Sequence, residues 1–253
     1  MADKSVVFWF SGTGNSLYAA KRISEAVGGV PLVRITDASP DEPAGGTGAK
    51  VGFVFPSYYG NLPRAVRAFA EKVRIEPGSY VFTVVTMGGM GQGSVWALDS
   101  LLKKRGITLN YGRCVLMNGN YIVNYDPAGA VSKVSNPVKI DSKIDACAAD
   151  IAAGKHSVKK IPFIASNLYK NIEALDAGFI TGEKCTGCGQ CEKLCPVRNI
   201  RVENGRPRWL HHCEHCVSCI NLCPVKAIDY GEQTKTRGRY INPHIKIEEL
   251  INP

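Results

Sequence analysis

Residues 185–196 read CTGCGQCEKLCP, and 28 positions further on, residues 213–224 read CEHCVSCINLCP. Both runs have the form C-x2-C-x2-C-x3-C-P, and Ile200 and Ile228 follow them in the same phase. Eight of the ten cysteines of this 253-residue chain lie in the two runs. The repeat predicts two copies of one small unit with pseudo-twofold symmetry. The region is too poor in apolar residues to form a large core, so we expect bound metal to stabilise it.

This cysteine spacing is that of bacterial iron–sulfur runs, in which the fourth cysteine of one run ligates the cluster of the other. Three closely spaced cysteines can surround one corner of a [4Fe–4S] cubane, and the fourth thiolate comes from elsewhere in the chain. We therefore expect a first cluster on Cys185, Cys188, Cys191 and Cys223, and a second on Cys195, Cys213, Cys216 and Cys219. A zinc ribbon would need two separate C-x2-C pairs, and these runs are too compact for it.

The remaining cysteines and nearby histidines have less specific interpretations. Cys114 and Cys147 lie outside the runs, and free cysteine is commonly a small buried hydrophobe. Three histidines flank the second run and could tune its cluster through hydrogen bonds; they are His211, His212 and His215. We favour the simpler interpretation, that they are solvated loop residues.

The first part of the chain alternates between apolar runs and helical patterns. The strand-like runs are 6–10, 31–35, 51–55, 80–86 and 107–117, and the helical patterns are 16–27, 63–73, 95–104 and 138–153. This order predicts an α/β fold with a doubly wound five-stranded parallel sheet, whose ligands bind at the carboxyl ends of the strands. We expect domains at 1–155 and 182–253, the second a smaller α+β domain, with a connector at 156–181.

The loop after the first predicted strand has the composition of a phosphate-binding turn. Glycines let the backbone approach a phosphate at a helix N-terminus, where free N–H groups point outward, and hydroxyl groups donate to its oxygens. The candidate residues are Ser11, Thr13, Gly14, Asn15 and Ser16. The loop lacks the third glycine of a dinucleotide fingerprint and the G-K-[ST] of a nucleotide-triphosphate loop.

Two further loops, after the third and fourth predicted strands, suit a flavin ring. Aromatic side chains fit the apolar faces of the ring, and exposed backbone groups of glycine-rich loops fit its polar edge. The candidates are Pro56, Ser57, Tyr58, Tyr59 and Gly60 in one loop, and Met87, Gly88 and Gly89 in the other. The alternative is that these are ordinary loop aromatics and turn glycines.

The chain as a whole resembles the fused flavodoxin/ferredoxin proteins of anaerobic bacteria and archaea. Residues 10–16 look like the FMN phosphate loop of that family, 55–63 like its isoalloxazine loop, and 117–122 like the segment after its fifth strand. In that last segment Asn118 stands where proline is more usual, and the resemblance implies a flavin contact from Asn120. It further implies FMN, two [4Fe–4S] clusters, a flavodoxin-like and a ferredoxin-like domain, and a role in electron transfer.

Two functions remain open, of which we favour the first. In one, the protein carries electrons between the clusters and FMN for a redox partner protein, and Gly60 or the Gly88–Gly89 pair could flip a peptide to stabilise half-reduced flavin. In the other, a ferredoxin-fed reductase acts on a small electrophilic or unsaturated substrate, with Tyr58, Tyr59 or Tyr121 as the proton donor. No nicotinamide fingerprint is visible, so direct NAD(P)H oxidation is not expected.

Net charge and hydropathy limit the partners and the cellular location that we expect. The formal net charge is +9, and two clusters with an FMN phosphate would reduce it to roughly +3. The basic residues are spread out and form no long arm, so we expect no nucleic-acid partner. We see no secretory signal and no apolar stretch of about 20 residues. We therefore expect a cytoplasmic protein without membrane insertion.

Overall fold

The computed structural model describes residues 4–89, 91–127, 137–161 and 171–252. The chain divides into two compact units, and each contains segments from distant parts of the sequence. The sheet unit consists of Met1–Phe10, Ser16–Met117 and Asn136–Ser166, and the cysteine unit of Ser11–Asn15, Asn118–Ser135 and Asn167–Pro253. Two segments that the sequence pattern places in the first domain, 11–15 and 118–127, thus group with the cysteine unit.

The sheet unit is built on a parallel sheet, which has six strands among the described residues. Its order is β2-β1-β4-β6-β7-β8, with β1 at Val6–Trp9, β2 at Leu32–Arg34, β4 at Lys50–Pro56, β6 at Tyr80–Met87, β7 at Leu109–Leu116 and β8 at Ser157–Val158. The first five follow the flavodoxin-like order 2-1-3-4-5. Like other parallel strands covered on both faces, the inner ones are mostly apolar, and Val7, Phe53 and Phe82 have no exposed surface.

The sixth strand corrects the expected number of strands. β8 pairs in parallel with β7, with Ser157 opposite Tyr111 and Val158 opposite Gly112. It lies in the segment that we predicted to be a connector. The Arg113 side chain of β7 also donates to the Ser157 carbonyl and hydroxyl (both 2.7 Å). Because a strand of two residues contains no hydrophobic run, the sequence pattern does not reveal it.

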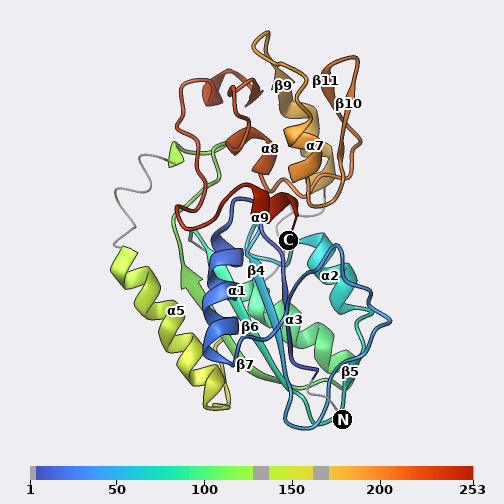
Figure 1. The fold of residues 1–253 in the computed structure, drawn as a ribbon, viewed down its shortest axis with the longest axis vertical. Coiled ribbons are helices and arrows are strands. Elements are labelled where there is room, and N and C mark those ends of the chain that lie inside the picture. Colours follow the sequence, from blue (N-terminus) through green and yellow to red (C-terminus); the bar gives the residue numbers. More distant parts are fainter. Residues whose placement is uncertain (1–3, 90, 128–136, 162–170, 253) are drawn as a thin grey trace. The chain divides into compact units, whose positions relative to one another are not determined.

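The main helices of this unit are α1 (Asn15–Ala26), α2 (Arg64–Ala70), α3 (Gln92–Lys104) and α5 (Pro137–Ala152). The α1 and α5 helices lie side by side, because Tyr18 Oη donates to Asp141 Oδ1 (2.8 Å) and Arg22 pairs with Asp145 (2.7 Å) (Figure 1). The α2 and α3 helices also contact each other. Within the described residues, no helix is both long and apolar enough to cross a bilayer. A two-stranded parallel pair, β3 (Ala44–Gly45) and β5 (Ile75–Glu76), completes the unit.

The cysteine unit has an α+β pattern of short elements. Its strands are β9 (Phe179–Thr181), β10 (Ile200–Glu203), β11 (Arg206–Trp209) and β12 (Ile228–Tyr230), and its helices are α7 (Gln190–Leu194), α8 (Ser218–Asn221) and α9 (Glu248–Ile251). A seven-residue 3-10 helix lies at Ile172–Gly178 and a single 3-10 turn at Glu232–Thr234. β10 pairs with β11 and β9 with β12, both antiparallel. Each cysteine run thus contributes one short helix and leads into one strand.

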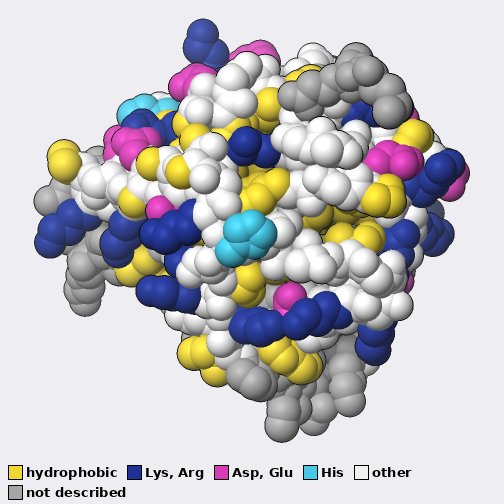
Figure 2. Space-filling view, turned by 90° about the horizontal axis from the view of Figure 1, so that it is seen from below, with side chains coloured by type: hydrophobic (Ala, Val, Ile, Leu, Met, Phe, Trp, Pro, Cys, Tyr) yellow, Lys and Arg dark blue, Asp and Glu magenta, His cyan; other side chains and the backbone are white. Residues whose placement is uncertain are grey.

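Basic side chains are dispersed over one face of the molecule (Figure 2). On the face shown in Figure 2, Lys and Arg lie in several separate groups between small apolar patches. This distribution agrees with the absence of a long basic arm in the sequence.

Candidate functional site

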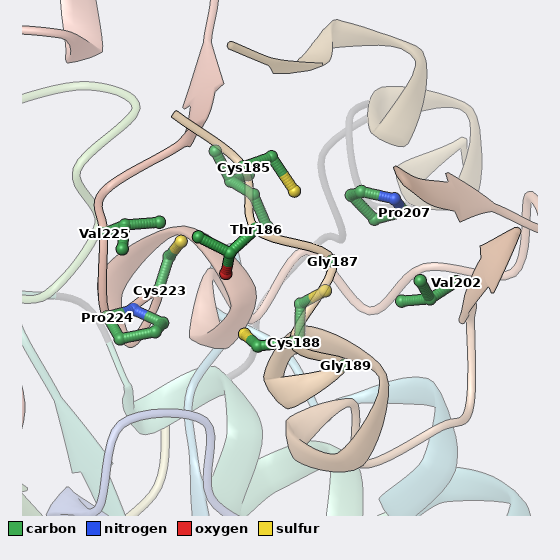
Figure 3. Close-up of a pocket in the computed structure, with 12 residues that line it drawn as sticks. Cys185, Thr186, Gly187, Cys188, Gly189, Val202, Pro207, Cys223, Pro224 and Val225 are labelled. Carbon is green, nitrogen blue, oxygen red and sulfur yellow. The ribbon is translucent and has the colours of Figure 1, made fainter. Parts of the chain in front are cut away.

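The eight clustered cysteines form two cavities of the cysteine unit. The first has about 340 Å³ of space including its open mouth, and its cysteines are Cys185, Cys188, Cys191 and Cys223. The second has about 310 Å³ on the same measure, and its cysteines are Cys195, Cys213, Cys216 and Cys219. These are the same two sets of four that the spacing predicts, each with its fourth cysteine from the other run. In Figure 3 the sulfurs of Cys185, Cys188 and Cys223 turn toward one space, which Val202 and Pro207 of the β10–β11 hairpin also line.

The backbone repeats along with the sequence. Residues two, four and thirteen positions after the first cysteine of each run have positive φ: Gly187, Gly189 and Arg198 in the first copy, and His215, Val217 and Lys226 in the second. The fourth cysteine of each run accepts a hydrogen bond from the backbone N–H four residues later, Asn199 to Cys195 Sγ (3.1 Å) and Ala227 to Cys223 Sγ (3.3 Å). The two copies therefore hold their cysteines with the same local geometry.

The second copy adopts this backbone at an energetic cost. Val217 has φ 56°, a region that a β-branched residue rarely enters and that costs about 1–3 kcal/mol for a non-glycine residue. Val217 is only 2% exposed and packs with Ile122, Ile220 and Ile228 in the core of the unit. Burial of its side chain offsets the strain.

The donor set fits iron–sulfur clusters. Burial raises the pKa of the Cys191 thiol to about 11 and that of Cys213 to about 12, and it raises the pKa of Cys216 and Cys219 well above the ordinary value. Buried thiolates need a positive partner, and iron binding supplies one while releasing the thiol protons. The backbone N–H groups directed at the sulfurs favour the same charged form. Among the described residues, no three His, Cys, Asp or Glu side chains converge as they do around a single ion.

Aromatic side chains enclose the second cavity. Phe179 stacks on Trp209 with ring centroids 5.4 Å apart and an interplanar angle of 6°, and both residues line the cavity. His215 packs against Phe179 and Tyr230 and meets the Tyr121 hydroxyl at its Nδ1 (2.8 Å). At 2% exposure it is not the solvated loop residue that we expected, and burial lowers its pKa to about 4. His211 and His212 are exposed, as expected.

Beside this cavity lies a buried carboxylate that the sequence pattern does not reveal. Asp176 accepts hydrogen bonds from Asn199 Nδ2 (2.9 Å) and the His211 backbone N–H (3.1 Å), and it meets His211 Nδ1 at 2.8 Å. The Asn199 side chain in turn accepts from the His212 N–H (2.7 Å). This network fixes the segment that enters the second cysteine run.

Of the predicted phosphate loop, Ser11–Asn15 lie in the cysteine unit and Ser16 in the sheet unit. Ser11 Oγ accepts from the Gly14 N–H (3.1 Å), and Thr13 Oγ1 accepts from Asn120 Nδ2 (2.6 Å). Both hydroxyl groups act as acceptors in these bonds, so each can still donate a hydrogen bond to another group. Gly14 has φ 96°, and a Cβ there would lie 3.0 Å from the Ile245 Cβ, so only glycine fits. A loop of this kind, directly before a helix, suits a phosphate.

Asn15 joins this loop to the C-terminal part of the unit. Its Oδ1 accepts hydrogen bonds from Tyr240 Oη (2.7 Å) and Asn242 Nδ2 (3.0 Å), and its Nδ2 donates to the Asn118 carbonyl (2.9 Å). The Asn242 N–H also donates to the Thr13 carbonyl (2.9 Å). Asn15 therefore holds the loop in shape through contacts within the protein.

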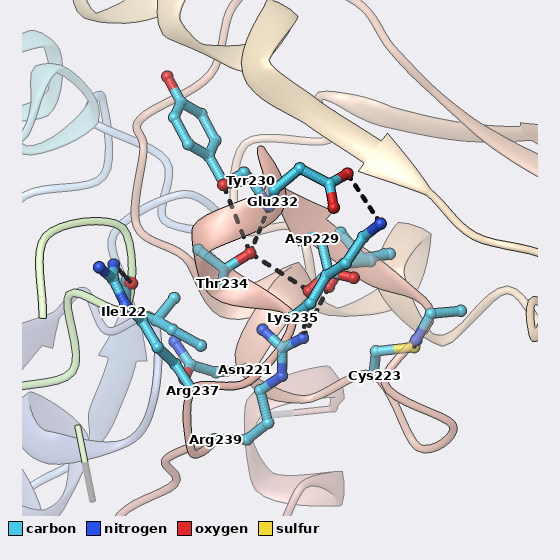
Figure 4. A network of polar contacts seen from close by, with 12 residues as sticks. Ile122, Asn221, Cys223, Asp229, Tyr230, Glu232, Thr234, Lys235, Arg237 and Arg239 are labelled. Atoms are coloured by element: carbon cyan, nitrogen blue, oxygen red, sulfur yellow. Dashed lines mark hydrogen bonds and ion pairs between the residues drawn. The ribbon is translucent and has the colours of Figure 1, made fainter. Parts of the chain in front are cut away.

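The same contacts reach the second cysteine run. Asn221, in α8 between Cys219 and Cys223, accepts from the Tyr240 N–H (3.0 Å) and donates to the Asn120 carbonyl (3.2 Å). A polar network beyond it fixes residues 229–239. In this network Arg239 pairs with Asp229 (2.7 Å), and Arg237 Nη1 donates to the Ile122 and Val123 carbonyls (both 2.7 Å) (Figure 4). The sequence did not single out Asn221 or Tyr240.

The two predicted flavin-ring loops lie in the sheet unit, each directly after a strand. Tyr58 and Asn61 exchange two backbone hydrogen bonds (3.0 and 2.9 Å) around Tyr59 and Gly60, whose φ angles of 52° and 76° make a type I′ turn. The loop is fixed at its base because the Ser57 N–H donates to the Thr86 carbonyl (2.8 Å). Tyr58 and Tyr59 are half-buried.

The second ring loop is more open. Pro56 ends β4 and Met87 ends β6, while Gly88 and Gly89 are exposed. Met90 of this loop lies outside the described residues. The hydroxyl of Ser16, at the start of α1, meets the Thr86 hydroxyl (2.7 Å), which fixes it near the end of β6.

The two other cysteines are in the sheet unit. Cys147 is buried and Cys114 half-buried, and desolvation raises the pKa of both, to about 12 for Cys114. Neither thiol is therefore prepared for nucleophilic chemistry at neutral pH.

Comparison with known proteins identifies the cysteine-rich segment. Residues 178–239 match the protein family described as 4Fe-4S dicluster domain. Three solved structures show weak likeness. One is a protein from Bacteroides uniformis provisionally named a flavoprotein (20% identity, TM-score 0.35, 46% of this chain and 92% of that one).

The second is the rubredoxin oxygen:oxidoreductase of Desulfovibrio gigas (13%, TM-score 0.40, 60% of this chain and 36% of that one). The third is an FMN-dependent NADH-azoreductase of Bacillus anthracis (10%, TM-score 0.39, 58% of this chain and 99% of that one). These likenesses are too weak to carry an argument, so the fold assignment rests on the strand order of the sheet.

Proposed function

We propose that this protein transfers electrons between two [4Fe–4S] clusters and FMN on behalf of a redox partner protein. The observation that carries the proposal is the pair of four-cysteine cavities, each completed by a cysteine from the other run. The family match over residues 178–239 supports the same reading. Cross-ligation would tie the two halves of the unit together and keep the clusters close enough for electron exchange.

In this proposal the clusters exchange single electrons, and FMN, which can hold one or two, converts between one-electron and two-electron chemistry. The chain supplies binding and shielding. Ser11, Thr13 and the first N–H groups of α1 would hold the FMN phosphate, with Gly14 allowing close approach. Tyr58, Tyr59 and Gly60, together with Met87, Gly88 and Gly89, would bind the ring. Asn120 would act indirectly, since its side chain donates to Thr13.

One contact in the structure concerns the alternative function, that of a reductase of a small substrate. The Tyr121 hydroxyl is in contact with His215 in the cysteine unit, which makes it a poorer proton donor for a substrate than Tyr58 or Tyr59. The carrier reading needs no general acid, so we keep it as the proposed function.

The proposal is tested by stopped-flow spectroscopy on the anaerobically reconstituted protein. A reduced bacterial ferredoxin is mixed with the oxidised protein, and bleaching of the clusters and of FMN is followed separately. We expect stoichiometric reduction of clusters and flavin, followed by reoxidation by a second carrier protein. Steady turnover with a panel of small enones, quinones and nitroaromatics, with no exchange between carriers, would replace the carrier reading by the reductase.

A further inference from the structure

The two cysteine cavities differ in their access to solvent. In the second, Cys213, Cys216 and Cys219 are only 8–9% exposed. In the first, Cys188 is exposed and the other three cysteines are half-buried. If the proposed function holds, on which this inference rests, a cluster in the first cavity is the one that an external carrier can approach.

Apolar side chains stand at the edge of the first cavity. Four large hydrophobic residues are exposed in the described part of the chain, and the two that belong to the cysteine unit are Ile180 (40%) and Val225 (36%). Val225 lines the first cavity, whereas Ile180 of β9 is opposite Asp229 and therefore lies on the other face of the β9–β12 pair from the cavity residue Ile228. Solvent-exposed Pro224 lies beside Val225. A small apolar surface of this kind is typical of the centre of a transient protein interface.

Positive charges lie at the edge of this apolar surface. Lys184, Arg206 and Lys226 are exposed and adjoin the cavity residues Cys185, Pro207 and Val225 in sequence. Within the described residues none of the three forms an ion pair, and Arg206 Nη1 donates to the Gly182 carbonyl (2.6 Å). The exposed carboxylate of the same stretch is Glu183, which leaves the group with a surplus of positive charge.

Two other arginines of the β10–β11 hairpin do have acidic partners. There Arg208 pairs with Glu203 (3.3 Å), and Arg201 lies 4.0 Å from Glu192 of α7. Arg201 and Arg208 are therefore compensated, in contrast to Lys184, Arg206 and Lys226 at the cavity.

We propose that the surface formed by Lys184, Arg206, Val225 and Lys226 docks an acidic protein electron carrier at the first cluster. Opposite charges speed the encounter, and the apolar centre lets the two redox centres approach closely. With a cluster bound there, one electron would pass between it and the partner's redox centre, so that one would be oxidised as the other is reduced, with no bond formed or broken. A second copy of the chain is a poorer occupant, because each carries a formal +9 charge.

The test uses the reconstituted full chain and a purified acidic bacterial ferredoxin, with stopped-flow rates measured across ionic strength. In the charge-reversed variant Lys184→Glu/Lys226→Glu, the second-order rate constant should fall about tenfold at low salt. The difference should disappear near 1 M salt, where the Debye length is about 3 Å. The matched control Lys72→Glu/Lys104→Glu, at two exposed lysines of the sheet unit, should keep the wild-type rate. When cationic cytochrome c is the carrier, the charge-reversed variant should instead react faster than the wild type.

A second variant separates apolar contact from charge. Val225→Ser should lower the rate at high salt as well as at low salt, without changing the salt dependence. Equal rates for the charge-reversed and control variants, with full iron in both, would overturn the docking proposal and leave the proposed function intact. Wild-type protein that binds no iron would overturn both. Sedimentation that shows a wild-type dimer, dissociated by Val225→Asp, would assign the surface to self-association instead.

Discussion

The substitution Tyr240→Phe is expected to weaken FMN binding only through the contacts that the protein makes with the FMN phosphate. The hydroxyl of Tyr240 donates to Asn15 Oδ1 (2.7 Å), and both side chains are no more than 8% exposed. Without it, Asn15 keeps its bond from Asn242 (3.0 Å), but one buried acceptor position is left unpaired. Such a loss costs about 1–2 kcal/mol. Because the loop is then no longer held in its binding geometry, the free energy of FMN binding becomes less favourable by the same amount. We expect the Kd for FMN to rise about 5- to 30-fold.

The assay is quenching of flavin fluorescence as FMN is titrated into flavin-free protein that carries its clusters. Riboflavin, which lacks the phosphate, serves as the second ligand and should bind the variant and the wild type equally. The matched control is Tyr80→Phe, which also removes one tyrosine hydroxyl bond, from Tyr80 Oη to the Lys155 carbonyl (2.6 Å), in the sheet unit. An unchanged Kd for FMN, or an equal loss for riboflavin, would refute the assignment of Asn15 and Tyr240 to the phosphate loop.

Three further results are expected. Cys195 belongs to the first run, but Cys195→Ser should remove the second cluster and leave the first. Iron analysis should then give about four irons per chain instead of eight. Loss of the first cluster alone would contradict cross-ligation. Gly189→Val should lower the stability of the cysteine unit by about 1–3 kcal/mol in urea unfolding, because Gly189 has φ 76°; an unchanged midpoint would show that the repeat tolerates either residue. Burial raises the pKa of Tyr240 to about 12 from an unfolded value near 10. The neutral form is favoured in the folded state, so this contribution is complete below pH 10 and is lost as the pH rises toward 12; urea midpoints from pH 9 to 11.5 should fall less steeply for Tyr240→Phe than for the wild type.

Most of the sheet unit could be predicted from the sequence because its strands are continuous apolar runs. The five main strands lie where the pattern places them, within one or two residues. β8 could not be predicted, since Ser157 and Val158 are held by backbone bonds to β7. The grouping of cysteines in the two cavities follows from their spacing, which is a local property of the chain.

The connections between distant segments could not be predicted. Asn15, Asn221 and Tyr240 meet through single polar contacts, and such contacts leave no periodic pattern in the sequence. The same reason explains the wrong expectation for His215. Its neighbours in the fold, Tyr121 and Phe179, come from remote parts of the chain, and their packing buries a side chain that looks like a loop residue in the sequence.

The central claim, that one chain holds two cubane clusters and one FMN, is tested most directly by quantifying iron, acid-labile sulfide and flavin on one anaerobically reconstituted sample, with EPR of the reduced protein. The account predicts about eight irons, eight sulfides and one FMN per chain, with the EPR of two interacting reduced clusters. A protein that takes up zinc in place of iron, or iron without flavin, would contradict it.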